Sequence, residues 1–239
     1  MPESVPVRCP VCRREHLFTA PSYPCACGAP VAPPLDRRSA PSVVTHRTWD
    51  DDWTAVRCAA CGREDLWPQP EVSCPCGTIL RVPVSGAVRP PGPSVPAGEG
   101  GPPPGRDEGP VPPWTAFRPV AVRTARDAVT AAALCLHRLG HRDIRRADQR
   151  QPKGIGLAGR GILAQVDPTA APASARDVEC LWLTALSESA RSVYFSLSGY
   201  ADDALRIADR LGVPLFVLGP SGTPRPVNGP ADELVADRA

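Results

Sequence analysis

The chain has little of what builds large apolar surfaces: only 5% of its 239 residues are aromatic, and it has one methionine. No apolar run approaches the ~18 residues that a membrane-spanning helix needs, and the longest candidate is Val129 to Leu136. The first ten residues lack the basic start, apolar stretch and cleavage site of a signal peptide. We therefore expect a cytoplasmic protein with no membrane partner.

Lysine is almost missing as well, because Lys153 is the only lysine among 27 basic residues. The formal net charge of +2 does not by itself demand a polyanionic partner. Proline is in excess instead, with 32 residues against an average usage of about 5%. One conventional core does not use that much proline, so we expect linkers and small loop-rich modules beside any larger domain.

Eight of the ten cysteines form a duplicated pattern that ends at Cys76. The four cysteines of the first copy recur 49 positions later with the same intervals, as Cys9, Cys12, Cys25, Cys27 and then Cys58, Cys61, Cys74, Cys76. Further identical pairs at this offset are Arg8 and Arg57, Arg14 and Arg63, Glu15 and Glu64, Leu17 and Leu66, Pro21 and Pro70, and Gly28 and Gly77. The repeat predicts two modules, at residues 7–34 and 56–83.

Two close pairs of thiolates can meet around one tetrahedral ion if the chain between them folds as a hairpin. We expect this within each copy, with Gly28 and Gly77 permitting the turn after the last ligand. Disulfides or two redox sites, the alternatives, do not predict four ligands at identical spacing twice. Each module resembles a zinc ribbon, although the second pair is Cys-x-Cys where Cys-x2-Cys is usual. The expectation is two structural zinc ions per chain.

Zinc ribbons bind nucleic acid, bind protein or support a neighbouring domain, and the cysteine spacing does not choose among these roles. Arginines beside the first cysteine pair of each copy favour nucleic acid, with Phe18, Trp49, Trp53 and Trp67 as candidate stacking surfaces. The alternative is that these aromatic side chains pack the small hairpins.

A segment rich in proline and glycine, residues 84–113, follows the second module. Such a composition cannot bury enough surface to offset its chain entropy, so we expect a disordered linker. Its Pro-Pro steps are an alternative docking site for a protein partner.

From residue 114 to residue 225 the composition becomes that of a globular domain, followed by an expected flexible tail at 226–239. Thr124 and Asp127 predict the start of a helix that ends at Gly140. Strands are expected at 143–147, 154–158 and 161–166, then a helix from Ser174 or Ala175, a strand at 192–196, a helix at 200–211 and a strand at 213–218. A strand, helix, strand unit requires a parallel pair, so the predicted class is α/β.

Several stretches of this domain resemble the Mrr-type domain of type IV restriction endonucleases, which has the PD-(D/E)xK nuclease fold. They are Leu139-Gly140-His141, the segment 154–157 (GIGL), the segment 162–167 (ILAQVD), the helix start at Asp177-Val178 and the closing segment 204–215 (ALRIADRLGVPL). The resemblance covers roughly residues 120–220 and implies a mixed sheet with flanking helices and a DNA partner.

The catalytic positions depart from that family. The resemblance implies an aspartate, then a carboxylate or glutamine two residues before a lysine, holding Mg²⁺; here these positions are Gly156, Gln165 and Asp167. Glycine offers no ligand, and an aspartate reverses the charge of the lysine. The alternative is that the ligands have moved, with Asp167 and Gln165 joined by Lys153 and by Asp177 or Glu179. Otherwise Asp167 only ends a strand and Asp177 caps a helix.

Loss of cleavage would leave DNA binding intact, because a basic cluster lies between residues 138 and 160. Its main candidates for phosphate contact are Arg142, Arg145, Arg146, Lys153 and Arg160. The sequence thus predicts a DNA-binding protein with a degenerate nuclease domain. The alternatives are an active Mg-dependent endonuclease, in which case Mg²⁺ joins the two zinc ions, and a protein-interaction scaffold.

Overall fold

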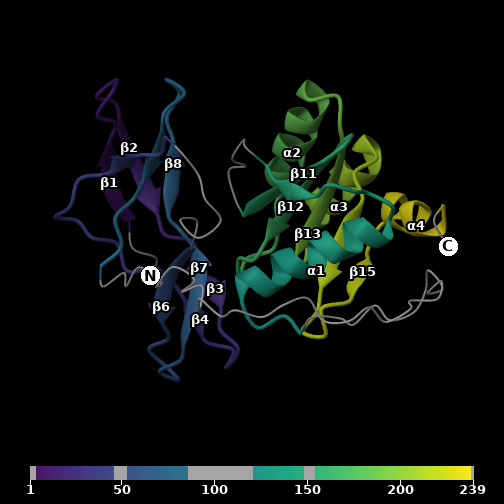
Figure 1. The fold of residues 1–239 in the computed structure, drawn as a ribbon, viewed down its shortest axis with the longest axis horizontal. Coiled ribbons are helices and arrows are strands. Elements are labelled where there is room, and N and C mark those ends of the chain that lie inside the picture. Colours follow the sequence, from purple (N-terminus) through teal and green to yellow (C-terminus); the bar gives the residue numbers. More distant parts are fainter. Residues whose placement is uncertain (1–3, 46–52, 86–120, 148–153, 238–239) are drawn as a thin grey trace, which may run out of the picture.

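The computed structural model describes residues 4–45, 53–85, 121–147 and 154–237. They form a half built of small β-hairpins and a half built of helices around a sheet, side by side (Figure 1). Most of the predicted linker lies outside the described residues, as do Trp49 and Lys153. No described helix has the length and apolar character needed to cross a membrane.

The C-terminal half is an α/β domain with a six-stranded mixed sheet in the order β10-β11-β12-β13-β14-β15. Strands β12, β13 and β14 run parallel, and the other neighbours are antiparallel. The elements are α1 (Ala125–Arg138), β10 (Arg145–Arg146), β11 (Ile155–Gly159), β12 (Ile162–Asp167), α2 (Ala175–Ser187), β13 (Arg191–Ser196), α3 (Asp202–Leu211), β14 (Leu215–Leu218), β15 (Pro224–Pro226) and α4 (Gly229–Ala236).

Local sequence signals set the ends of these helices. The Thr124 hydroxyl accepts a hydrogen bond from the Asp127 N–H at 3.2 Å, and the Asp127 carboxylate accepts one from the Thr124 N–H at 3.0 Å. This reciprocal pair satisfies two donors at the start of α1 that the helix itself leaves unbonded. Gly212 ends α3 with φ +66°, a left-handed conformation that glycine adopts at little cost.

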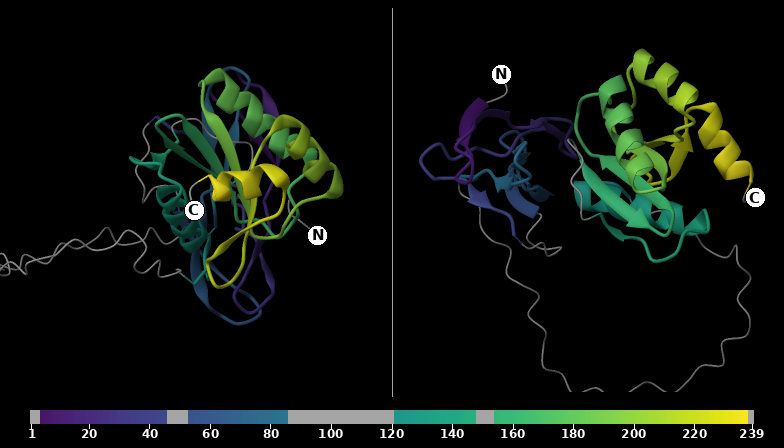
Figure 2. Two further views of the ribbon diagram at one scale, coloured as in Figure 1. Left: turned by 90° about the vertical axis from the view of Figure 1, so that its right-hand side faces the viewer. Right: turned by 90° about the horizontal axis from the view of Figure 1, so that it is seen from above.

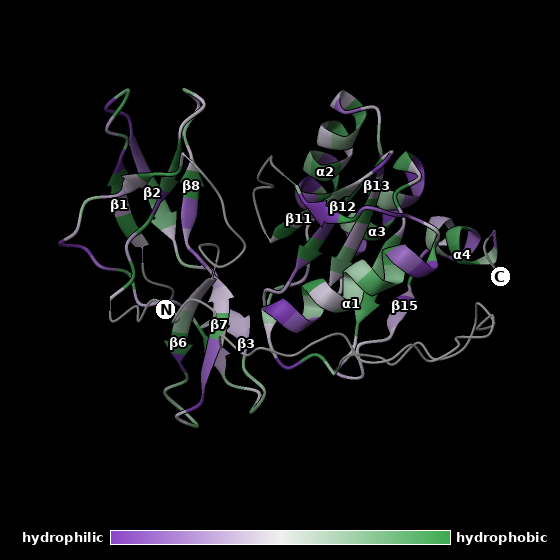
Figure 3. Ribbon diagram, in the orientation of Figure 1, coloured by the Kyte–Doolittle hydropathy of each residue, from purple (hydrophilic) through white to green (hydrophobic). Residues whose placement is uncertain are grey.

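The two faces of the sheet carry separate apolar clusters, because alternate residues of each strand point to opposite sides. Along β12, Ala164 and Val166 pack toward α1 and α4, whereas Leu163 packs toward α2 and α3. Figure 2 shows the helices on the two sides of the sheet. In Figure 3 hydrophobic and hydrophilic segments alternate along α1 and α2, as expected of helices with one buried face.

The N-terminal half consists of short antiparallel hairpins. Its strands are β1 (Ser4–Arg8), β2 (Glu15–Thr19), β3 (Tyr23–Pro24), β4 (Pro30–Val31), β5 (Ser42–Val43), β6 (Trp53–Arg57), β7 (Glu64–Pro68), β8 (Glu71–Ser73) and β9 (Ile79–Arg81). They pair as β1-β2, β3-β4, β6-β7 and β5-β9-β8. Together with the C-terminal half, they give the mixed α/β class that the sequence predicts.

The predicted order of helix, three strands, helix, strand, helix, strand is confirmed, with boundaries shifted by at most two residues. The flexible tail expected at 226–239 is wrong for its described part, because residues 229–236 form α4. Asn228 explains why: its side chain caps α4 by accepting from the Ala231 N–H and also bonds the Leu215 N–H and the Val213 carbonyl. One buried amide thus ties the last helix to β14.

We expect the substitution Asn228→Ala to destabilise the α/β domain by about 2–4 kcal/mol, because it removes a helix cap and leaves two buried backbone groups without partners. Urea unfolding followed by circular dichroism measures this. Asn228→Asp is the matched variant: it retains the acceptor oxygen but cannot donate to Val213, and should lose less. An Asn228→Ala variant as stable as the wild type would refute this role.

Candidate metal centres and basic edge

The eight N-terminal cysteines form two four-sulfur clusters, and each draws on both sequence repeats. One cluster, the first site, consists of Cys9, Cys12, Cys74 and Cys76, and the other, the second site, consists of Cys25, Cys27, Cys58 and Cys61. The predicted eight ligands and two sites are therefore present. The expected grouping within each repeat is wrong, because the Cys-x2-Cys pair of one repeat meets the Cys-x-Cys pair of the other.

Strand pairing accompanies the exchange. After the pair at Cys9 and Cys12, strand β2 pairs with β1, whereas the short strand β3 before Cys25 pairs with β4. No ladder among the described residues joins β2 to β3, and each cluster is completed by a hairpin of the other repeat.

The sulfur geometry fits bound metal and not disulfides. The closest cross-repeat contacts are Cys9 with Cys76 at 3.8 Å, Cys12 with Cys74 at 3.4 Å, Cys25 with Cys61 at 3.8 Å and Cys27 with Cys58 at 3.9 Å. Two thiolates on one tetrahedral zinc ion, each about 2.3 Å from it, lie about 3.8 Å apart. A disulfide bond would need about 2.05 Å. Both clusters can hold a structural metal ion such as zinc, with all four ligands from the protein.

Backbone turns shape each knuckle around the sulfurs. Gly28 and Gly77 have φ of +87° and +88°, so the predicted glycine turns after the last ligands are present. In the Cys-x2-Cys turns, the N–H groups of Arg13 and Gly62 donate to the carbonyls of Cys9 and Cys58. The two repeats therefore build the same pair of turns, and only their partners are exchanged.

The thiols of each cluster differ strongly in pKa. Hydrogen bonding with Thr78 lowers the pKa of Cys76 to about 6, and the Cys61 and Ala60 N–H groups lower that of Cys58 to about 7. At Cys25 the Cys27 N–H acts in the same direction, but burial and the neighbouring thiols outweigh it and raise the pKa to about 12. Four adjacent thiols cannot all ionise at neutral pH by themselves, and a bound cation removes this obstacle.

The aromatic residues proposed for base stacking take up structural positions instead. Trp53 and Trp67 are 4% and 1% exposed, and the Trp67 ring stacks on Tyr23 with centroids 5.0 Å apart. Phe18 is half-buried against the cluster around the first site. Packing of the hairpins, the alternative to stacking on bases, is thus confirmed for these three residues.

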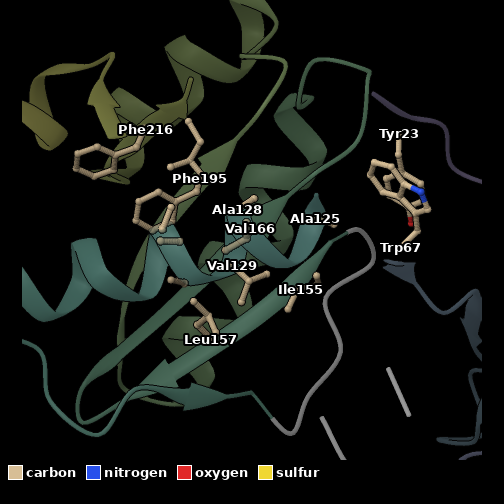
Figure 4. Close-up of a cluster of buried hydrophobic side chains, with 14 of the residues drawn as sticks. Tyr23, Trp67, Ala125, Ala128, Val129, Ile155, Leu157, Val166, Phe195 and Phe216 are labelled. Atoms are coloured by element: carbon tan, nitrogen blue, oxygen red, sulfur yellow. The ribbon is translucent and has the colours of Figure 1, made fainter. Parts of the chain in front are cut away.

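The second site lies where the two halves of the protein meet. Cys25, Cys58 and Trp67 belong to one apolar cluster with Ala125 and Ala128 of α1, and Figure 4 shows Tyr23 and Trp67 near the start of that helix. The Ala170 N–H donates to the Ser22 carbonyl at 2.8 Å across the junction. A cavity of about 670 Å³ runs along it. In contrast, the described residues of the apolar cluster around the first site all belong to the N-terminal half.

In the α/β domain, the candidate catalytic residues share one face of β12 but are closed off from solvent. Gln165 and Asp167 are 1% and 0% exposed. The Tyr194 hydroxyl joins them: it accepts from the Gln165 Nε2 at 3.2 Å and donates to the Asp167 Oδ2 at 3.3 Å. The Thr169 N–H donates to the Asp167 Oδ1 at 2.9 Å. Burial, with the nearby charges of Asp167 and Asp177, raises the pKa of Tyr194, so its hydroxyl stays protonated.

The relocated ligand set is met only in part among the described residues: Asp167 and Asp177 both lie close enough to Tyr194 to raise its pKa, and Lys153 lies outside the described residues. Asp177 caps α2, because its carboxylate accepts from the Ser174 N–H at 2.9 Å and from the Ser174 hydroxyl at 2.6 Å. Glu179 is exposed on the outer surface of that helix, and β12 ends at Asp167. Two of the acidic groups thus have structural roles, as the simpler interpretation of the sequence holds.

Three of the basic candidates lie near the turn of the β11-β12 hairpin, at the end of β12 opposite to Asp167. We call this group, together with Arg191, the basic edge (Arg142, Arg145, Arg160, Arg191). Arg160 lies in the turn between these strands and Arg145 pairs with Ala158, whereas Gln165 and Asp167 lie toward the opposite end of β12. A Cβ placed on Gly159 would be 3.3 Å from the Arg142 carbonyl oxygen, so the chain at Arg142 runs alongside the turn. The predicted Arg146 is half-buried opposite Leu157.

Arg191 belongs to the basic edge although sequence reasoning missed it. Its N–H donates to the Gly161 carbonyl at 2.9 Å, next to Arg160, and its side chain is exposed. The parallel pairing of β12 with β13 brings it there from 31 positions beyond Arg160 in the sequence. Only a prediction of strand register could have found it.

Comparison with known proteins finds no matching family model, no matching curated protein and no matching solved structure. The function is therefore inferred from the geometry of this chain.

Paired cysteine substitutions test the exchanged grouping. The variant Cys12→Ser/Cys76→Ser damages only the first site, so it should still bind one Co²⁺ with full four-thiolate absorption. The variant Cys12→Ser/Cys27→Ser removes one ligand from each site and should show no four-thiolate Co²⁺ spectrum. Each variant is the other's control, because both lose two cysteines. The reverse pattern would show that each repeat binds its own ion.

Proposed function

We propose that this protein binds DNA through its α/β domain without cleaving it, and that two zinc ions hold its N-terminal half together. The observation that carries the proposal is the basic edge, where four exposed arginines from three separate segments converge at one end of the sheet. Arginines grouped in this way contact successive phosphates and give affinity that depends on salt but little on sequence.

The strand order and the helices on both faces are consistent with the restriction endonuclease-like fold that the Mrr resemblance implies. Within that fold, Gly156 supplies no ligand and Asp167 lies where a lysine is expected. Burial adds a second obstacle, because a metal-bound phosphate would have to reach a carboxylate that is 0% exposed and already accepts two hydrogen bonds. Of the described candidates, Gln165 and Asp167 therefore offer no ligand that a metal-bound phosphate can reach.

Salt dependence tests the binding part of the proposal. We expect fluorescence anisotropy to show that a short duplex binds at low salt, with log K falling linearly against log salt concentration. Neutralising Arg142, Arg160 and Arg191 to glutamine should lower that slope by about two to three, because each phosphate contact contributes roughly 0.9. The matched control neutralises three exposed arginines elsewhere on the domain, Arg176, Arg206 and Arg225, and should change the slope little. Binding that ignores salt, or equal losses in both variants, would contradict the proposal.

A cleavage assay tests the catalytic part. Supercoiled plasmid incubated with the zinc-loaded protein in Mg²⁺ or Mn²⁺ should remain intact.

A stability measurement tests the structural role of Asp167. The substitution Asp167→Ala should lower the free energy of unfolding by about 1–3 kcal/mol, because the Tyr194 hydroxyl and the Thr169 N–H lose their buried acceptor. Tyr194→Phe is the companion variant, since it removes the same hydrogen bond and leaves the carboxylate. Nicking that disappears in Asp167→Ala would establish an active site.

A further inference from the structure

The two metal sites are the centres of two similar modules. The first module is β1-β2 with β8-β9, and the second is β6-β7 with β3-β4. Their interiors correspond at the repeat offset of 49: Trp67 stacks on Tyr23 in the second module, and Phe18 packs with Val72 in the first. A surface that makes a contact in one module therefore has a counterpart in the other.

In the second module, strand β7 lies against the start of helix α1 (Figure 1). Arg63, Glu64 and Asp65 line a hollow together with Arg123, Thr124 and Asp127 from the helix start. The next residue, Leu66, packs against the apolar cluster that includes Ala125, Ala128 and Val129. Strand β7 therefore contacts a helix whose buried face is made largely of alanine.

Strand β2 of the first module repeats these contact residues on an open surface. Arg14, Glu15 and Leu17 are identical to Arg63, Glu64 and Leu66 at the repeat offset. Leu17 is nevertheless 76% exposed, the highest value among the exposed large apolar side chains, and nothing in the described part of the chain covers it. Val11, in the adjacent knuckle, is 65% exposed. Within the described part of the chain, β2 thus leaves exposed a leucine whose counterpart in β7 is half-buried.

We propose that strand β2 is a docking site for the alanine-faced start of a helix from a partner protein, bound as β7 binds α1. Leu17 would take the place of Leu66 against the small side chains of that helix. Arg14 and Glu15 would face its first turn, as Arg63 and Glu64 face Arg123 and Thr124. In this binding mode, a helix is held through a few side chains along one of its faces.

A second copy of this chain cannot be the general occupant. Each chain carries two such strands, β2 and β7, but one helix α1, which β7 already contacts. If two chains exchanged their α/β domains, two of the four strands would still lack a helix. Helix α1 of a second copy therefore cannot cover every β2, and a helix on this strand must come from another protein.

One difference between the strands bears on specificity. Burial, joined by the like charge of the nearby Asp127, raises the pKa of Asp65 in β7. The corresponding residue of β2 is His16. Acidic residues are common in the first turn of a helix, where the helix dipole stabilises their charge. Such a residue in a partner helix would therefore meet a histidine at this position of β2, and not a carboxylate.

A helix taken from the chain itself serves as the probe. A peptide of residues 121–139, with Cys135→Ser and a hydrocarbon staple joining the exposed positions 130 and 134, presents the face of α1 that β7 contacts. We expect it to shift backbone amide resonances of β2 in the isotope-labelled, zinc-loaded full-length chain. Leu17→Asp should weaken binding by about tenfold or more. Leu183→Asp, at an exposed leucine of α2, should leave it unchanged.

Two checks keep the outcome decisive. Metal content and the circular dichroism spectrum show whether Leu17→Asp folds, and Leu17→Asn replaces it if it does not. The proposal is overturned if the wild type shows no shifts up to about 1 mM peptide, if both Leu17 variants bind as the wild type does, or if the shifts fall on β7. Sedimentation that shows self-association, lost in Leu17→Asp, would assign the strand to a second copy and also overturn it.

Discussion

The meeting of cysteines from both repeats in each four-sulfur cluster is the constraint on which the N-terminal half depends. The described residues 4–45 and 53–85 form hairpins of two to five residues per strand, around small apolar clusters. At each site a knuckle from one repeat meets a knuckle from the other, so neither repeat is a module by itself. Metal bound at these sites would add its binding free energy to the stability of the whole half.

Interleaving also gives the two sites different surroundings. The second site shares its apolar cluster with helix α1, so it links metal binding to the position of the α/β domain, whereas the first site supports only the hairpins around it. A duplicated sequence has thus produced one docked strand and one open strand with the same contact residues. In the α/β domain a comparable division separates the buried Gln165–Tyr194–Asp167 network from the basic edge at the other end of the hairpin.

Local features of this fold were predictable from the sequence, and long-range pairings were not. The capping box at Thr124, the alternation along β12 and the glycine turns after Cys27 and Cys76 depend on neighbouring residues, and all are present. The exchange of cysteine pairs joins residues 31 to 67 positions apart, which the spacing within each repeat does not reveal. Arg191 joins the basic edge only through strand register, and α4 exists because a single asparagine bonds to distant backbone groups.

The most direct test of the interleaved account is a nuclear magnetic resonance experiment on the cadmium-substituted protein that correlates each metal nucleus with the cysteine protons of its ligands. The account predicts two cadmium resonances, one coupled to the Cβ protons of Cys9, Cys12, Cys74 and Cys76 and the other to those of Cys25, Cys27, Cys58 and Cys61. A resonance coupled to Cys9, Cys12, Cys25 and Cys27 would contradict it.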